Sequence, residues 1–251
     1  MRRTKMICFI MLLLITHLVL TGCMPSNVRI QTADRQMLSP KTTNLVAGLR
    51  EIKDNRPENE KEYEQYYEKP HKTTINEKLY KELKMSGLFQ DVLYEKFDDN
   101  KIDVILDPQV DHFYYETKAN GWTAFNLLFA FTGLPGLIYQ LAGGPNGEHY
   151  GEANLGIKMS TIEGHVLASG NGEKILTLNS NLHNRTTDGI GIIEGRALSD
   201  ATYETLLSLS TNIDLDKLPK TKIAKSGNCG SDKDCKGDRI CVDKICVNPP
   251  Q

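Results

Sequence analysis

The sequence predicts an α/β (α+β) fold built on a mixed sheet, with helices on one or both faces of that sheet. Three observations predict it. Residues 44–115 pass from a strand-like to a helix-like and back to a strand-like apolar pattern, residues 150–178 alternate as a β-hairpin does, and residues 194–209 carry the apolar stripe of a helix. We also expect an apolar helical insertion in the domain and a small disulfide-stapled module near the C-terminus.

The chain divides into segments of contrasting composition. Of its 251 residues, 25% are charged and 39% are apolar, as in an ordinary soluble protein. No basic stripe of the kind that binds nucleic acid occurs, so we expect no nucleic-acid partner. The expected segments are a leader at 1–22, a tether at 23–43, an α/β domain at 44–219 with an apolar insertion at 121–144, a linker at 220–228 and a cysteine-rich module at 229–246.

The leader has the layout of a secretory signal peptide. Arg2, Arg3 and Lys5 give a positive start, an almost unbroken apolar run covers residues 7–20, and small residues then precede Cys23. An uncleaved membrane anchor is the alternative, but the run is short for a membrane span.

Leu20-Thr21-Gly22-Cys23 resembles the bacterial lipobox, which is read by the lipoprotein signal peptidase. The resemblance implies that Cys23 is the lipidation site: its thiol is diacylglycerated, the chain is cut before it, and the new amine receives a fatty acid such as palmitate. Met24 stands where Asp would retain an enterobacterial lipoprotein in the inner membrane. We therefore expect a protein of the cell envelope, lipid-anchored in the outer membrane and facing the periplasm.

The domain opens with a strand and a charged loop. Residues 44–53 alternate weakly with a period of two, and Pro57 ends the pattern because proline cannot continue a hydrogen-bonded ladder. Residues 58–72 are charged and contain Tyr63, Tyr66 and Tyr67. We interpret them as a solvated loop, with a binding role as the alternative.

Residues 73–86 give the clearest helical pattern. Thr73 or Thr74 can cap it, Glu77 completes a capping box with Thr74, and Gly87 is placed to end the helix in a left-handed conformation. Strands are expected at 92–97 and at 102–115, separated by a turn at 98–100 and with the second strand interrupted near Pro108; Asp103 opens that strand.

This order of elements resembles the periplasmic α/β domain shared by the curli-secretion lipoprotein, the lipoprotein activators of peptidoglycan synthases and the N-terminal domain of the Tol-system translocation protein. The likeness covers residues 45–215, roughly, and rests on short motifs: the polar turn at 54–56, Gly87-Leu88-Phe89, and the Asp-led strand at 103–106. Those domains are not enzymes, so the resemblance implies no catalytic residues.

Residues 121–144 form a long uncharged stretch, broken in its middle by Gly133-Leu134-Pro135-Gly136. We interpret it as two short apolar helices that cover a sheet face, with contact to a membrane or to a partner as alternatives. In the curli-secretion lipoprotein this interval carries a membrane-inserting β-hairpin, whereas this segment does not alternate. The possible contact residues are Trp122, Phe125, Leu128, Phe129, Phe131, Leu134, Leu137, Ile138 and Tyr139.

The second half of the domain reads as a hairpin followed by a helix. Strands are expected at 150–160 and 164–178, a polar loop at 179–188 and a final helix at 194–209, and Pro219 closes the domain.

Four cysteines gather after the linker: Cys229, Cys235, Cys241 and Cys246. An exported chain meets an oxidising compartment, so two disulfides are expected, and zinc is the rival although no Cys-x2-Cys pair is present. The stretch resembles the cysteine-rich modules of the Dickkopf N-terminal type.

The residues suggest no active site, metal site or cofactor. His112 lies between Asp111 and Glu116 on an expected strand, which is a weak hint of acid–base or metal chemistry. The glycines of 143–147 and of 169–172 are interpreted as loop and turn signals.

Two functions remain. The first is a non-enzymatic envelope lipoprotein that is bound to the membrane by its lipid and binds or helps assemble an envelope protein or polymer. The second is a membrane-active or translocation component that uses residues 121–144. Ring-like oligomers would favour the second function and a monomer the first.

Overall fold

The computed structural model describes residues 27–34, 41–94, 97–119, 147–180, 187–219, 240–242 and 245–247. Its main element is a mixed six-stranded sheet in the order β3-β1-β4-β5-β6, with β2 paired separately to β4. The strands are β1 Val46–Leu49, β2 Lys53–Asp54, β3 Asp91–Tyr94, β4 Val104–Ala119, β5 Gly147–Ser160 and β6 Val166–Ser180. β1 runs parallel to β3 and β4, whereas β4, β5 and β6 are antiparallel neighbours. The mixed α/β sheet that the sequence predicts is therefore confirmed.

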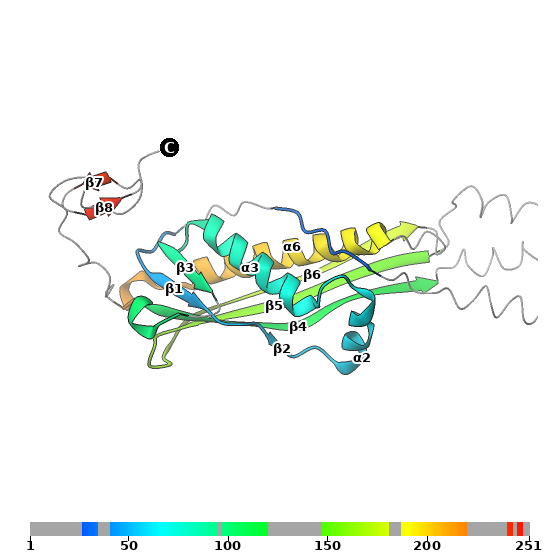
Figure 1. The fold of residues 1–251 in the computed structure, drawn as a ribbon, viewed down its shortest axis with the longest axis horizontal. Coiled ribbons are helices and arrows are strands. Elements are labelled where there is room, and N and C mark those ends of the chain that lie inside the picture. The colour runs from blue at the N-terminus through cyan, green and yellow to red at the C-terminus, as the bar shows by residue number, and fades with distance from the viewer. Residues whose placement is uncertain are drawn as a thin grey trace, which may run out of the picture.

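Two long helices, α3 His71–Ser86 and α6 Thr187–Asn212, cover one face of this sheet (Figure 1). The main hydrophobic core lies between them and the sheet, and includes the fully buried Leu83 of α3, Leu206 of α6 and Leu155 of β5. A second, small apolar cluster on the other face is formed by Val46, Ile102 and Ile105. Of the two arrangements that were expected, the described residues show helices on one face.

Helix α3 ends as predicted but starts earlier. Gly87 follows its last residue in a left-handed conformation, with a φ of 66°. The helix begins at His71, directly after Pro70, and the expected capping box of Thr74 and Glu77 does not form. Thr74 Oγ1 donates instead to the Pro70 carbonyl at 3.4 Å inside the first turn. Proline suits this position because its missing N–H would have no helical partner.

The expected first strand at 44–53 is two short strands, and Pro108 explains why. β4 runs unbroken through Pro108, contrary to expectation, while its parallel neighbour changes there from β1, which ends opposite Leu106, to β2, which starts opposite Gln109. Proline offers no N–H, and it lies where β4 has no parallel partner. Asp103 precedes β4 and accepts a hydrogen bond from the Val46 N–H at 2.9 Å.

Residues 58–72 are mostly helical, so the predicted loop is wrong. They contain α2 Glu58–Lys61, the 3-10 helix η1 Glu62–Tyr66 and the start of α3. The turn predicted at 98–100 is the 3-10 helix η2 Asp99–Lys101, and a further one, η3 Leu215–Lys217, follows α6. High local charge suggested a loop. The stretch is ordered instead by partners from the distant β4, where Glu60 accepts from His112 and from the Phe113 N–H.

The hairpin of β5 and β6 is confirmed, and α6 extends beyond the predicted 194–209 at both ends. Gly170 and Gly172 lie within β6 rather than in a turn. A Cβ at these positions would be 2.3 Å from the Thr205 carbonyl oxygen and 2.2 Å from that of Ala201. The glycines therefore let the backbone of α6 approach the sheet directly.

Other predictions fall outside the described residues: the apolar insertion at 121–144, Cys23, Cys229 and Cys235. β7 Ile240–Val242 and β8 Ile245–Val247 form a small antiparallel sheet in which the backbone of Cys241 lies opposite that of Cys246. The disulfides stay a prediction. Among the helices that the structure describes, none is both long and apolar enough to cross a membrane.

Candidate functional site

Residues 27–34, which we call the N-terminal strap, lie against the helical face of the domain. The Val28 N–H donates to the Tyr66 carbonyl at 2.8 Å, and the Val28 carbonyl accepts from the Glu68 N–H at 2.9 Å. Val28 is only 1% exposed. The strap falls inside the segment expected to be a spacer, so contact with the domain already begins five residues after Cys23.

The strap continues along small residues of α6. The Gln31 N–H donates to the Gly191 carbonyl at 2.9 Å, and the Ala33 N–H donates to Ser199 Oγ at 3.0 Å. A Cβ on Gly191 would lie 1.9 Å from a strap carbonyl oxygen, and one on Gly195 would lie 2.0 Å from another. Two residues of extended chain and four residues of helix both advance about 6 Å, so alternate strap residues meet every fourth residue of α6.

The strap starts at one end of the domain, which we call the strap end (Figure 1). Here η1 and the start of α6 lie beside the open end of the sheet, where Ala119, the last residue of β4, pairs with Gly147, the first of β5. The polar groups described next are concentrated at this end.

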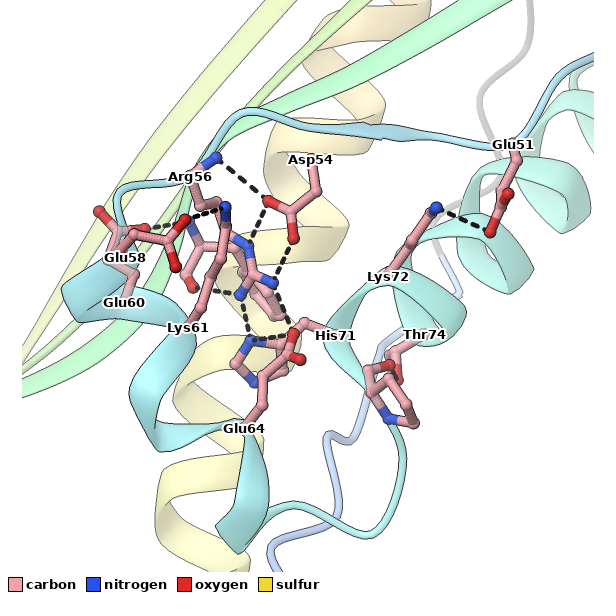
Figure 2. A network of polar contacts seen from close by, with 12 residues as sticks. Glu51, Asp54, Arg56, Glu58, Glu60, Lys61, Glu64, His71, Lys72 and Thr74 are labelled. Atoms are coloured by element: carbon pink, nitrogen blue, oxygen red, sulfur yellow. Dashed lines mark hydrogen bonds and ion pairs between the residues drawn. The ribbon is translucent and has the colours of Figure 1, made fainter.

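Arg56 is the centre of a buried polar network at the strap end (Figure 2). Its side chain is fully buried, and the guanidinium donates to both Asp54 oxygens, Nε to Oδ1 at 3.0 Å and Nη2 to Oδ2 at 2.8 Å. Nη2 also donates to Glu64 Oε1 at 2.5 Å. Burial opposes ionisation of Asp54, but the hydrogen bonds from Arg56 outweigh it and hold the Asp54 pKa below its ordinary value. The network joins β2, η1 and α3.

His71, the first residue of α3, completes this network. Its Nδ1 lies 2.5 Å from Arg56 Nη1, and its ring meets the rings of Tyr67 and Phe113 edge-on at 4.3 and 4.8 Å. Burial lowers the His71 pKa to about 3, and the charge of Arg56 acts in the same direction. Since Nδ1 must accept from the arginine, the neutral ring carries its proton on Nε2, which has no partner among the described residues.

Tyr67 links the network to α6. Its hydroxyl donates to Glu194 Oε1 at 2.8 Å, and Glu194 is fully buried. Burial raises the Glu194 pKa to about 8, although the hydrogen bond from Tyr67 acts in the opposite direction. Glu194 Oε2 has no hydrogen-bond partner among the described residues, in keeping with a carboxyl group that is protonated at neutral pH.

A pocket of about 500 Å³ opens beside the last part of β4. Glu60 borders it and accepts from His112 Nδ1 at 2.7 Å and from the Phe113 N–H at 3.1 Å. The Tyr114 hydroxyl donates to Glu152 at 2.8 Å. The hydrogen bond to Glu60 raises the His112 pKa above its ordinary value. The lining residues are Asn59, Glu60, Tyr63, His112, Tyr114, Tyr115, Glu116, Thr117, Glu152 and Ile190.

Tyrosine rings and carboxylates on one concave surface can hold a small polar or positively charged group by stacking and hydrogen bonding. The volume is within the range of ligand pockets. The part of the chain that the structure describes has no group of three His, Cys, Asp or Glu side chains that could hold a metal ion.

The structure brings four of the residues singled out from sequence into this site: Tyr63, His112 and Glu116 line the pocket, and Tyr67 joins the network. His112 lies in the pocket, but it bonds Glu60 from α2 instead of its sequence neighbours Asp111 and Glu116. Asp111 accepts from Asn55 at 2.9 Å, and Glu116 pairs with Lys118 at 3.1 Å.

Sequence reasoning missed Arg56, Glu60, His71 and Glu194 as parts of a site. One signal was present: Arg56 lies two residues after the end of a strand and precedes a tyrosine-rich charged stretch, where a binding role was the alternative to a loop. Nothing local pointed to Glu194, because its partner Tyr67 is 127 residues away.

No known family profile and no curated protein matches this sequence. Among solved structures, the chain is similar to a DUF330-family protein from Xanthomonas campestris, with 12% identity, 73% of this chain and 91% of that chain covered, and a TM-score of 0.39. It is also similar to the PelC dodecamer from Paraburkholderia phytofirmans, with 11% identity, 70% of this chain and 96% of that chain covered, and a TM-score of 0.38. A neuraminyllactose-binding hemagglutinin homolog from Helicobacter pylori is similar with 8% identity, 76% of this chain and 93% of that chain covered, and a TM-score of 0.37.

Proposed function

We propose that this chain is a non-enzymatic lipoprotein of the cell envelope, which is anchored by acyl chains on Cys23 and binds or helps assemble another envelope component. The strap carries this proposal. An extended chain spans at most about 3.6 Å per residue, so an acylated Cys23 would keep Val28 within about 18 Å of the bilayer. A single acyl chain binds a membrane marginally, whereas the two or three chains that a lipobox implies anchor it stably.

The pocket at the strap end supports a binding role. It combines Tyr114 and Tyr115 with the carboxylates of Glu60 and Glu152, and it lies on the side from which the anchor would emerge. Its occupant would be part of an envelope protein or polymer. Met24 after the lipobox cysteine supports the outer membrane, with the domain facing the periplasm.

Replacing Cys23 with serine tests the anchor. The Cys23→Ser variant should lose the acyl chains and their mass, and fractionation after detergent-free lysis should show altered membrane association. Cys8→Ser is the matched control, because Cys8 leaves with the leader and its loss should change neither mass nor location of the mature protein. A Cys23→Ser protein with the same membrane association and the same mass as the parent would contradict the proposal.

A photo-crosslinker at Asn59, an exposed residue that lines the pocket, tests the binding role. We expect it to capture an envelope component in the native membrane, whereas a crosslinker at the distant Val166 should not. Equal capture from both positions would contradict a binding site at the strap end.

A membrane-active or translocation component is the second candidate, and one observation favours it. Residues 120–146 connect Ala119 to Gly147, so this apolar connection leaves and re-enters the sheet at the strap end, on the side of the proposed anchor. Leu128→Asp and Leu137→Asp should then leave the domain folded and abolish leakage of vesicles that carry the lipidated protein. If these variants unfold the domain, the segment is core and this function fails.

A further inference from the structure

We infer that η1 contacts the bilayer, with Tyr63 and Tyr66 resting in the layer of zwitterionic phospholipid headgroups. This inference rests on the proposed function, because it requires an acylated Cys23. It adds which surface of the domain meets the membrane and which lipid chemistry that surface accepts.

The first step concerns reach. From Cys23 to Val28 the chain can span at most about 18 Å, whereas α6, with its 26 residues, is about 39 Å long. The tether is therefore too short for the anchored domain to turn end over end and place the end opposite the strap end against the bilayer. The strap is also fixed along its length, since Ala33 bonds Ser199 and Asp34 pairs with Lys81 at 2.7 Å.

The second step concerns which surface is nearest to the anchor. The chain enters the domain at Val28, which is hydrogen-bonded to the carbonyl of Tyr66, the last residue of η1. Tyr63 lies one turn earlier, and the two rings are 6.4 Å apart. Tyr63 is 49% exposed, so η1 presents a large aromatic side chain within reach of the bilayer surface.

The third step concerns chemistry. A tyrosine has an apolar ring and a polar tip, and such side chains are enriched at headgroup depth. The exposed side chains beside them are of both signs, Glu62 and Glu68 against Arg29 and Lys69, and Arg29 lies 4.0 Å from Glu68, so this surface offers no net positive charge to anionic lipids. The described residues therefore favour an uncharged interface, such as phosphatidylcholine or phosphatidylethanolamine, and the contact should be insensitive to salt.

Tryptophan fluorescence can test this inference on the lipidated full-length protein. The chain has one tryptophan, so Trp122→Phe removes its native tryptophan fluorescence. In this variant, Tyr63→Trp and Tyr66→Trp are the two probes. Val166→Trp is the control, since Val166 is 55% exposed at the start of β6, at the opposite end of the sheet from Gly147. The proteins are reconstituted in phosphatidylcholine vesicles, with or without a lipid that carries a nitroxide quencher at its headgroup.

We expect both probes to lose much of their fluorescence with the quencher at low and at high salt, and the control to lose little. Equal quenching of probes and control, or none at position 63 or 66 in protein that floats with the vesicles, would overturn the inference while leaving the anchor intact. Quenching that disappears at high salt would overturn the zwitterionic contact. Protein that neither floats nor carries the acyl mass would refute the proposed function, and this inference with it.

Discussion

Arg56 shows at the scale of one residue how a polar group can hold a domain end together. Its guanidinium is out of contact with water, and two carboxylates and a neutral histidine occupy its donors. Burying a charge is costly unless it is paired and hydrogen-bonded, so the network needs all of its members.

Replacing Arg56 with methionine should lower the free energy of unfolding by about 3 kcal/mol, because it leaves Asp54, Glu64 and His71 without their donor. Denaturant titration measures this. The control is Arg50→Met, since Arg50 pairs with Asp107 at 3.0 Å but both side chains are well exposed, and such a pair contributes less than about 1 kcal/mol. Equal losses in the two variants would contradict the structural role of Arg56.

Glu194 predicts a pH dependence of stability. Its pKa is raised to about 8 in the folded protein, so at neutral pH the unfolded chain releases a proton that the folded chain keeps. The stability contributed by this group therefore falls as pH rises from the ordinary value of about 4.5 towards 8. Glu194→Gln keeps an acceptor for Tyr67 and should stabilise the protein at pH 7 by up to about 3 kcal/mol.

The comparison of Glu194→Gln with the parent should be made at two pH values. At pH 4, about at or below the ordinary pKa of a glutamate, the two proteins should unfold at similar denaturant concentrations. A variant that is less stable than the parent at pH 7, or a difference that does not grow between the two pH values, would show that Glu194 is ionised in the fold.

At the scale of elements, the strap and α6 act as one unit. Gly195 lies where the strap backbone leaves no room for a Cβ. Gly195→Ala should therefore displace the strap, and the Gln31 and Ala33 amides should exchange hydrogen faster. Arg196→Ala, at an exposed neighbouring position of α6, is the control and should leave these amides protected. Unchanged protection in Gly195→Ala would contradict the close contact.

Elements with a strong local signal could be predicted from sequence. The β5–β6 hairpin alternates cleanly and Gly87 ends a striped helix, and both are confirmed. The starts of α3 and α6, the helices within 58–72 and the continuous β4 could not be predicted, because distant partners decide them. Pro108 interrupts a local pattern, yet it fits a strand whose neighbour changes at that residue.

The candidate site was less predictable than the fold. His112 was noticed, but its partner Glu60 lies 52 residues away. The strap was expected to be a spacer because its residues show no periodicity. An extended segment that bonds a helix through its backbone needs none, and the signal lies instead in the spacing of Gly191, Gly195 and Ser199.

At the scale of the whole molecule, the C-terminal module should be held by covalent bonds. A stretch as short as 229–246 cannot build a core, and each closed loop should contribute about 2–3 kcal/mol in the chain-entropy model. Protein purified from the envelope should show no free thiol among Cys229, Cys235, Cys241 and Cys246. Four titratable thiols per chain, or one bound metal ion per chain, would contradict this.

The strap, the pocket, the end of β4 and the start of β5 all lie at one end of the molecule. The proposal that this end faces the membrane depends on the lipid anchor at Cys23. The mass of the mature protein, extracted from its own envelope, tests this most directly. The account predicts a chain that begins at Cys23 and carries a diacylglycerol and a fatty acid on that residue. A mature chain with an unmodified Cys23, or with a different first residue, would contradict it.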